Sequence, residues 1–190
     1  MISKRLLILA LAALPLLAAC QKPPAVNADG SLNSPFWVDI KEPHTAGNKV
    51  DVLARLACDA YYVSLRFYFD RDSPQDRNRV RALVGGDDRK VGPDKYYVYG
   101  NGVPFPVRLT VAEITATGER VVLRREGSFP LTSWGGDSFG KVIMSERLLT
   151  GLYRVRLDIL SNSPAYTGTR VRLLMTGAPK AFTPAHLCNP

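Results

Sequence analysis

Alternation of apolar and polar residues is the dominant pattern of the chain from Phe36 onward. Between Tyr61 and Phe69 every odd position is apolar or aromatic, whereas Ser64 and Arg66 fall on the opposite side. Side chains alternate between the two faces of a strand, so this segment is predicted to be a strand buried on one face. The same reasoning predicts eight strands, at residues 36–40, 50–56, 61–69, 105–114, 120–124, 141–144, 152–159 and 170–175.

One segment has helical spacing instead. Ser73 is a suitable N-cap, Pro74 fits the first helical position, and Gly85 follows the last apolar residue of the segment. These signals predict one short helix over 74–84 that covers an end or an edge of the strands. Residues 86–104 are predicted to form a long polar connection. The expected fold class is all-β, a two-sheet antiparallel β-sandwich (immunoglobulin-like or jelly-roll-like) with one short helix.

The first residues have the pattern of an export signal. Lys4 and Arg5 precede an apolar run over 6–17, and small residues lead up to Cys20. A basic start, an apolar core and small residues before a cleavage site are typical of a secretory signal peptide, here 1–19. The sequence Leu17-Ala18-Ala19-Cys20 resembles the lipobox of bacterial lipoproteins. The alternative is an ordinary cleaved signal that happens to be followed by a cysteine.

Cys20 is therefore the expected lipid-attachment residue. Acyl chains such as palmitate on this thiol would hold the protein to a membrane without a spanning helix, because each buried methylene contributes about 0.8 kcal/mol. Gln21, rather than Asp, follows the cysteine. In proteobacterial lipoproteins this resembles the signal for the outer membrane, with the protein facing the periplasm.

The rest of the chain divides into a tether and one domain. Residues 20–35 are rich in Pro, Asn and Ser, a composition that predicts a flexible tether, and 36–190 form the predicted sandwich domain. Removing the signal takes away Lys4 and Arg5 and no acid, so the formal charge falls from +8 to +6. This favours acidic partners or anionic head groups, while nucleic acid is not an expected partner of an envelope protein. Many arginines lie in strand-like patterns, where a solvated sheet face explains them better than a dedicated basic site.

Two further cysteines form an even pair once Cys20 is lipidated. Cys58 and Cys188 would meet in an oxidising compartment, which predicts a disulfide between the C-terminal tail and an early strand. A metal site is the alternative, but the chain has no Cys-x-x-Cys, and His44 and His186 stand alone. A catalytic thiol has still less support.

Three neighbouring acids could form a calcium site. Asp70, Asp72 and Asp76 lie close together, but arginines and Pro74 interrupt them and no glycine marks the bend. Positions at the end of a strand and the start of a helix explain these acids better, because carboxylates stabilise a helix N-terminus. No metal is expected.

Catalytic arrangements are equally weak. The chain has no Gly-x-Ser-x-Gly nucleophile elbow and no phosphate-binding loop. His44 could act as a base, and Asp137 with Glu146 could act as a carboxylate pair, but nothing in the sequence brings either arrangement together. The sequence therefore predicts a protein that is not an enzyme and needs no cofactor.

Two loops have the composition of a protein-binding surface. Tyrosine supplies amphipathic contact area at little entropic cost, and arginine supplies forked donors. The alternative is that these aromatic residues fold back and close the ends of the sandwich. The candidate partner-binding residues are Asp87, Asp88, Arg89, Lys90, Tyr96, Tyr97 and Tyr99 in the first loop, and Trp134 and Asp137 in the second.

Several motifs together resemble a family of proteobacterial lipoproteins catalogued only as a domain of unknown function. The most specific is the Asp-Arg-x-Arg-Val-Arg-x-Leu-Val-Gly pattern of the predicted helix. The resemblance runs through most of residues 36–176 and implies an all-β sandwich. For some members it implies a role as immunity proteins against toxins delivered by contact-dependent systems such as type VI secretion. The residues that carry it are 36–38, 62–67, 76–85, 104–109 and 151–156.

Three functions follow as hypotheses. The first is an immunity lipoprotein that binds an antibacterial effector and occludes its active site or its access to lipid or peptidoglycan. The second is a structural or assembly lipoprotein of a secretion or pilus system. The third is an enzyme or a carbohydrate-binding module in which Trp134 would stack on a sugar.

Overall fold

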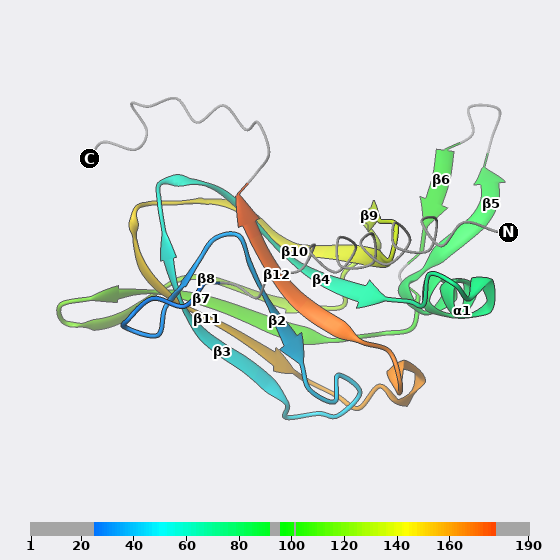
Figure 1. Ribbon diagram of the computed structural model, residues 1–190, viewed down its shortest axis with the longest axis horizontal. Helices are drawn as coiled ribbons and strands as arrows, with labels where there is room; N and C mark the ends of the chain where they lie inside the picture. The colour runs from blue at the N-terminus through cyan, green and yellow to red at the C-terminus, as the bar shows by residue number, and fades with distance from the viewer. Residues whose placement is uncertain (1–24, 92–95, 101, 178–190) are drawn as a thin grey trace, which may run out of the picture.

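Two five-stranded β-sheets packed face to face form the body of the protein (Figure 1). The computed structural model describes residues 25–91, 96–100 and 102–177. A third sheet consists of two strands only. The predicted fold class, a two-sheet β-sandwich with one short helix, is confirmed.

The first sheet, which we call sheet A, has the strand order β1-β3-β11-β7-β8. Neighbouring strands are antiparallel, except that β1 lies parallel to β3. A bulge interrupts the pairing of β7 with β8 between Val111 and Ala112. The strands of sheet A are β1 (Leu32–Asn33), β3 (Lys49–Leu56), β7 (Val107–Thr115), β8 (Gly118–Gly127) and β11 (Gly151–Ile159).

The second sheet, sheet B, has the order β2-β12-β4-β10-β9, and all its pairs are antiparallel. Each of the eight predicted strands matches one observed strand, with ends that differ by a few residues, because strict alternation marks the middle of a strand better than its ends. The strands of sheet B are β2 (Phe36–Ile40), β4 (Asp59–Tyr68), β9 (Ser133–Trp134), β10 (Ser138–Leu148) and β12 (Val171–Gly177).

The predicted long connection over 86–104 is wrong in its first part, because it contains a hairpin. Strand β5 (Gly86–Val91) pairs with β6 (Tyr96–Tyr99), with Val91 opposite Tyr96. The intervening sequence Gly-Pro-Asp-Lys has turn composition, and an aromatic run over 96–99 follows it. The many polar residues of β5 hide that signal from an alternation test.

An aromatic cluster forms part of the buried core near α1 (Pro74–Val84). The ring of Phe67 on β4 lies 5.4 Å from that of Phe105 and 5.5 Å from that of Tyr166, between ring centroids. Tyr166 belongs to a short 3-10 helix, η2 (Pro164–Tyr166), and is fully buried. Its hydroxyl lies 3.0 Å from the carbonyl oxygen of Leu83 and 2.8 Å from that of Val103. It therefore joins the last turn of the helix over 74–84 to the segment before β7.

The predicted helix is confirmed as α1 (Pro74–Val84). The Ser73 hydroxyl caps it by accepting a hydrogen bond from the backbone N–H of Asp76, 3.1 Å away. Val80 and Val84 are fully buried. Gly85 ends the helix at φ 93°, and a Cβ there would lie 2.1 Å from the carbonyl oxygen of Gly100, so only glycine fits this C-cap.

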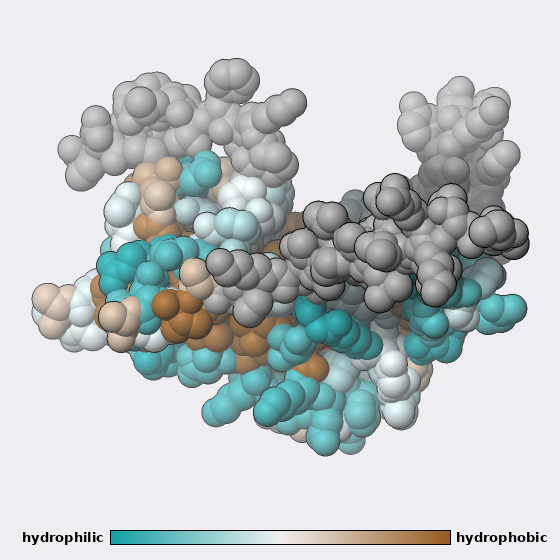
Figure 2. Space-filling model, viewed as in Figure 1, coloured by the Kyte–Doolittle hydropathy of each residue, from teal (hydrophilic) through white to brown (hydrophobic). Residues whose placement is uncertain are grey.

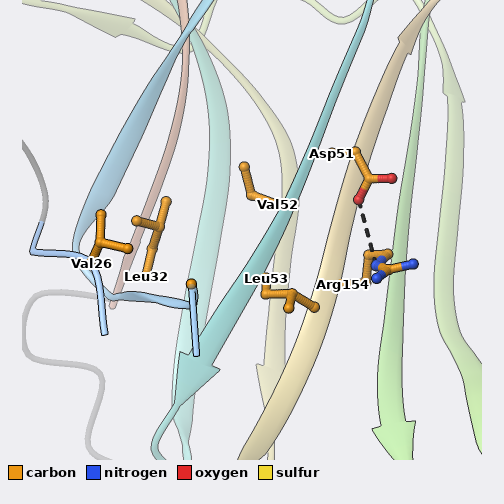
Figure 3. Close-up of a pocket in the computed structure, with 7 residues that line it drawn as sticks. Val26, Leu32, Asp51, Val52, Leu53 and Arg154 are labelled. Carbon is orange, nitrogen blue, oxygen red and sulfur yellow. Dashed lines mark ion pairs between the residues drawn. The ribbon is translucent and has the colours of Figure 1, made fainter. Parts of the chain in front are cut away.

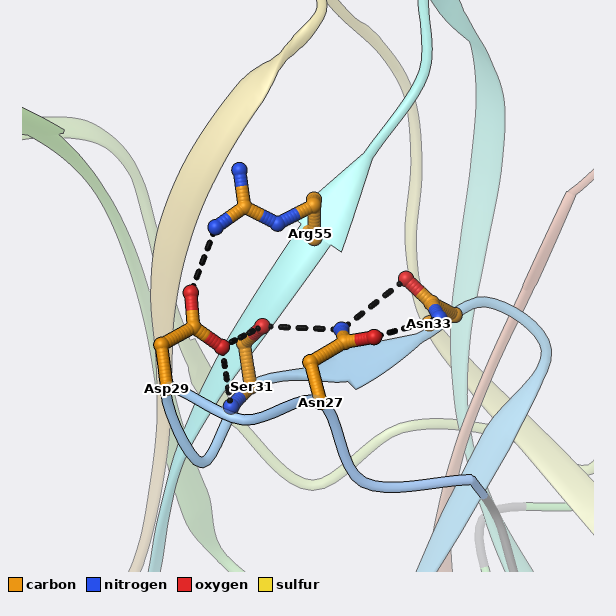
Figure 4. A network of polar contacts seen from close by, with 5 residues as sticks. All are labelled: Asn27, Asp29, Ser31, Asn33 and Arg55. Carbon is orange, nitrogen blue, oxygen red and sulfur yellow. Dashed lines mark hydrogen bonds and ion pairs between the residues drawn. The ribbon is translucent and has the colours of Figure 1, made fainter.

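Residues 26–33 form an arm along the edge of sheet A, although the sequence predicted a flexible tether over 20–35 (Figure 4). The Asn27 side chain donates to the hydroxyl of Ser31 at 2.9 Å and exchanges hydrogen bonds with Asn33. Asp29 accepts from both the hydroxyl and the backbone N–H of Ser31 and pairs with Arg55 of β3. The polar residues that suggested a tether therefore satisfy one another, and the folded domain begins before residue 36.

Lys141 is a charged residue inside the sandwich, on the inward face of β10 opposite Leu65. Its side chain is 1% exposed, and Nζ lies 5.9 Å from the centroid of the Phe67 ring. Burial lowers the pKa of Lys141 to about 8, because the charged form loses its hydration. The sequence predicted a strand over 141–144 but not that Lys141 points inward.

Parts of the predicted organisation lie outside the described residues: the signal peptide 1–19, Cys20 and Cys188. The signal, the lipid attachment and the Cys58–Cys188 disulfide therefore stay predictions. No helix within 25–91, 96–100 and 102–177 is long and apolar enough to cross a membrane.

The arm should loosen in acid. The hydrogen bonds from Ser31, followed by the contact with Arg55, lower the pKa of Asp29 to about 2. A carboxylate with a lowered pKa stabilises the fold above its ordinary pKa of about 3.9 and loses that effect as the pH falls toward 2. We therefore expect hydrogen exchange of residues 26–33 to be slower in the wild type than in Asp29→Asn at pH 5, and the difference to vanish near pH 2.

Lys141 should make stability rise with alkaline pH. Its folded pKa lies below the unfolded one, so between about pH 8 and 10.5 the unfolded chain binds the extra proton and the fold gains stability. Relative to Lys141→Met, the free energy of unfolding of the wild type should rise by up to about 3 kcal/mol over that range. Urea unfolding at pH 8 and pH 10.5 measures this, and a flat difference would contradict the burial of the ammonium group.

Candidate partner-binding surface

The helix end of the sandwich brings the two predicted partner-binding loops together. We define it as α1, the β5–β6 hairpin, the turn 135–137 between β9 and β10, and η2. Figure 1 shows α1, β5, β6 and β9 gathered at the right-hand end. The backbone of 87–90 and 96–99 lies in this hairpin, so Asp87, Asp88, Arg89, Lys90, Tyr96, Tyr97 and Tyr99 are placed there, while their side chains lie outside the described part of the structure.

Trp134 helps to close this end of the core. Its ring packs edge-on against Phe139, with centroids 5.1 Å apart and an interplanar angle of 88°. A Cβ added at Gly86 would lie 3.2 Å from the indole, so the start of β5 approaches the ring closely. The alternative interpretation, an aromatic residue that closes the sandwich, describes Trp134 better than an open stacking platform.

Asp137 lies beside an open hollow of about 510 Å³ at the same end. Its carboxylate accepts a hydrogen bond from the Arg71 guanidinium at 3.0 Å. Tyr68, Phe69 and Arg170 also line the hollow, together with Asp70, Asp72, Asp76 and Gly168. Asp137 is thus part of a surface with both aromatic and charged groups.

Acids around this hollow accept hydrogen bonds from neighbouring groups of the protein. Asp76 accepts from the backbone N–H of Asp70 and from Arg79, and Asp70 accepts from the backbone N–H of Asp72. These hydrogen bonds lower the pKa of Asp76, the one from the Asp70 N–H having the largest effect. Within the described residues no group of three His, Cys, Asp or Glu side chains is arranged to hold a metal ion.

An arginine–aromatic stack continues from the hollow along the outer face of sheet B. The guanidinium of Arg172 lies 5.0 Å from the ring centroid of Tyr68 and 5.6 Å from that of Trp37, and the guanidinium of Arg170 lies 5.5 Å from Tyr68. Asp39 accepts from Arg170 at 3.1 Å and from Arg172 at 2.8 Å. These donors, Arg170 first, hold the pKa of Asp39 below its usual value.

Sequence reasoning missed this stack. The alternation placed Arg170 and Arg172 on one face of a strand, where they read as solvated charges. Trp37 and Asp39 come from β2 and Tyr68 from β4, and only the pairing of β12 with both strands brings them together. The Trp-x-Asp and Arg-x-Arg patterns each show that two residues share one face of their own strand. Nothing in the sequence shows that the two strands are neighbours.

The imagined carboxylate pair is separated by the length of a strand. Asp137 precedes β10 and Glu146 lies near its other end, which puts them roughly 30 Å apart at about 3.3 Å per residue. Glycosidase carboxylates lie about 5 to 10 Å apart. Glu146 instead pairs with Arg125 at 3.1 Å, and His44 lies in the β2–β3 connection, where its carbonyl accepts from the Ser163 N–H.

The family model described as a domain of unknown function (DUF5625) matches residues 22–176, which include the arm, both sheets and the helix end. The chain belongs to the DUF5625 family. None of the curated protein sequences matches it. Among solved structures, this DUF5625 domain is similar to a crystal structure of a protein from Sulfurospirillum deleyianum. The match has a TM-score of 0.62, 16% identity, and coverage of 77% of this chain and 98% of that one. At that identity the likeness shows a shared fold.

Trp134 and Asp137 should differ sharply in their effect on stability. Trp134→Ala removes a ring from the closed end of the core, so the free energy of unfolding should fall by about 3 kcal/mol. Asp137→Ala breaks a partly exposed ion pair and should cost less than about 1 kcal/mol. Chemical denaturation of both variants measures this, and equal losses would show that Trp134 is not a packing residue.

Proposed function

We propose that this DUF5625 protein is an immunity lipoprotein of the envelope, held by lipid on Cys20 at the periplasmic face of the outer membrane. It binds a secreted antibacterial effector through the helix end and the adjoining arginine–aromatic stack. Occlusion by binding is the mechanism, so the protein needs no reaction and no cofactor of its own.

The observation that supports this most directly is the stack formed by Arg170, Arg172, Tyr68 and Trp37. The few residues that dominate the binding energy of protein interfaces are enriched in Trp, Tyr and Arg. Here Asp39 and the rings fix both guanidiniums in place, so little side-chain freedom remains to be lost on association. Arg170 is 54% exposed and available to an acidic partner.

The membrane anchor rests on the lipobox-like sequence before Cys20, and strand pairing favours the predicted disulfide. Gly177, the last residue of β12, pairs with Tyr61, and a Cβ on it would lie 3.1 Å from the Asp59 carboxylate. The chain therefore passes next to Cys58 before it continues to Cys188. Eleven residues span up to roughly 36 Å, so the tail is long enough to return to Cys58.

An Arg170→Glu variant tests the proposed surface. The reversed charge repels an acidic partner and Asp39 alike, so the dissociation constant for the effector should rise at least tenfold, about 1.4 kcal/mol. The effector is taken from a competing strain by pulldown with the mature protein, and its affinity is then measured by calorimetry. In a growth competition, cells that carry the variant should lose the protection that the wild type gives.

Arg108→Glu is the matched control, because Arg108 is a partly exposed arginine that is also in an ion pair, with Glu126, but lies on sheet A. It should leave affinity and protection unchanged. Both variants should melt within a few degrees of the wild type, since exposed ion pairs contribute about 0–1 kcal/mol. A gene deletion that leaves cells as resistant as before would contradict the immunity role. If a secretion or pilus component binds instead, the assembly role applies.

A further inference from the structure

Exposed apolar side chains occur at the end of the sandwich opposite α1. Four large apolar residues are exposed within the described part of the chain: Val26 (65%), Val121 (59%), Leu149 (50%) and Val122 (39%). Isolated exposed apolar residues are ordinary on a protein surface. Their gathering in one half of the molecule is the feature that needs an explanation.

Strand register places Val121 and Val26 near the two ends of one row across sheet A. Val121 pairs with Ala112, Ala112 with Arg154, and Arg154 with Leu53, so one row crosses sheet A from β8 to β3. The arm pairs with β3 at the next residues, which brings Val26 beside this row, and Leu149 lies in the turn that leads into β11. We call this region, namely the arm, the β10–β11 turn and the β7–β8 hairpin, the arm end.

Figures 1 and 2 show the contrast between the two ends. The arm and the β7–β8 hairpin extend to the left, opposite α1. In the face that Figure 2 shows, brown apolar atoms lie over the left and centre, whereas the right-hand end around α1 is mostly hydrophilic.

An open hollow of about 520 Å³ lies beside the arm (Figure 3). Val26, Leu32 and Leu53 supply its apolar lining, and Arg154 pairs with Asp51 within it. Arg154 and Arg156 each pair with both Asp51 and Glu119. Two positive and two negative groups thus neutralise one another, which lowers the cost of moving this face into a less polar medium.

The short distance along the chain between Cys20 and the arm indicates that this medium is the membrane. Only residues 21–25 separate Cys20 from Val26, and the arm is fixed to β3, so Val26 lies within roughly 20 Å of the thiol even at full extension. A lipid on Cys20 therefore keeps the arm end close to the membrane, and exposed valine and leucine side chains suit the boundary between head groups and acyl chains.

We propose that the arm end is a membrane-contacting surface, in which Val26, Val121, Val122 and Leu149 lie at the head-group level. The inference rests on the proposed lipid anchor and adds an orientation to it. Strand β4 starts at the arm end and leads to α1, and its ten residues span roughly 33 Å. The helix end, with its arginine–aromatic stack, then faces away from the membrane, where a partner has free access.

Quenching of tryptophan fluorescence by brominated acyl chains tests this. The lipidated protein is placed on phosphatidylethanolamine–phosphatidylglycerol vesicles as Val121→Trp, Leu149→Trp or the control Ala82→Trp, which is exposed on α1. Native Trp37 and Trp134 add the same background to each. Both arm-end variants should lose roughly twofold more fluorescence than the control. Interfacial side chains enter the membrane by only about 5–10 Å, so a tryptophan on α1 would stay out of reach of the brominated chains.

The outcomes separate the orientation from the anchor and from partner binding. Flotation with the vesicles reports the anchor alone, and effector affinity reports the proposed function. Protein that floats but shows equal quenching in all three variants would overturn the orientation, as would arm-end variants that are shielded from lipid by a second copy in a cross-linked dimer. Stronger quenching of both arm-end variants in floating protein supports it, whatever the effector.

Discussion

The contact between the Tyr166 hydroxyl and two carbonyl oxygens holds the helix end together. Phe67 and Phe105 pack on the ring, while Leu83 and Val103 bring the end of α1 and the start of the β7 segment to the same point. A buried hydroxyl without partners would be costly, so the geometry of all these segments is fixed at once. Gly85 and Gly102 permit the approach, because any side chain there would collide with backbone.

Charge on the outer faces is organised by pairing. On sheet A, Arg154 and Arg156 neutralise Asp51 and Glu119, and exposed apolar residues lie beside them. On sheet B, Arg170 and Arg172 share a single acid, Asp39, and lie on aromatic rings. The first arrangement suits a lipid boundary and the second an acidic protein partner. One sandwich therefore offers two chemically different surfaces, one on the outer face of each sheet.

The arm connects these surfaces to the proposed anchor. A flexible tether of sixteen residues would leave the domain free to tumble above the membrane, whereas Asp29 and Arg55 fix residues 26–33 to β3. With the proposed lipid on Cys20, only residues 21–25 would separate the anchor from the arm, and this short link would limit the height and rotation of the domain. A fixed orientation would raise the fraction of encounters in which the helix end meets the proposed partner, without any change in its contacts.

The sequence by itself determined the sandwich class, the eight main strands and the helix with both of its caps, because alternation, capping and glycine are local signals. Only the tertiary structure placed Trp37, Asp39, Tyr68 and Arg172 in one stack, turned the expected tether into an arm, and gathered the exposed valines at one end. These features depend on which strands become neighbours and in what register, and register arises from packing between segments far apart in the chain.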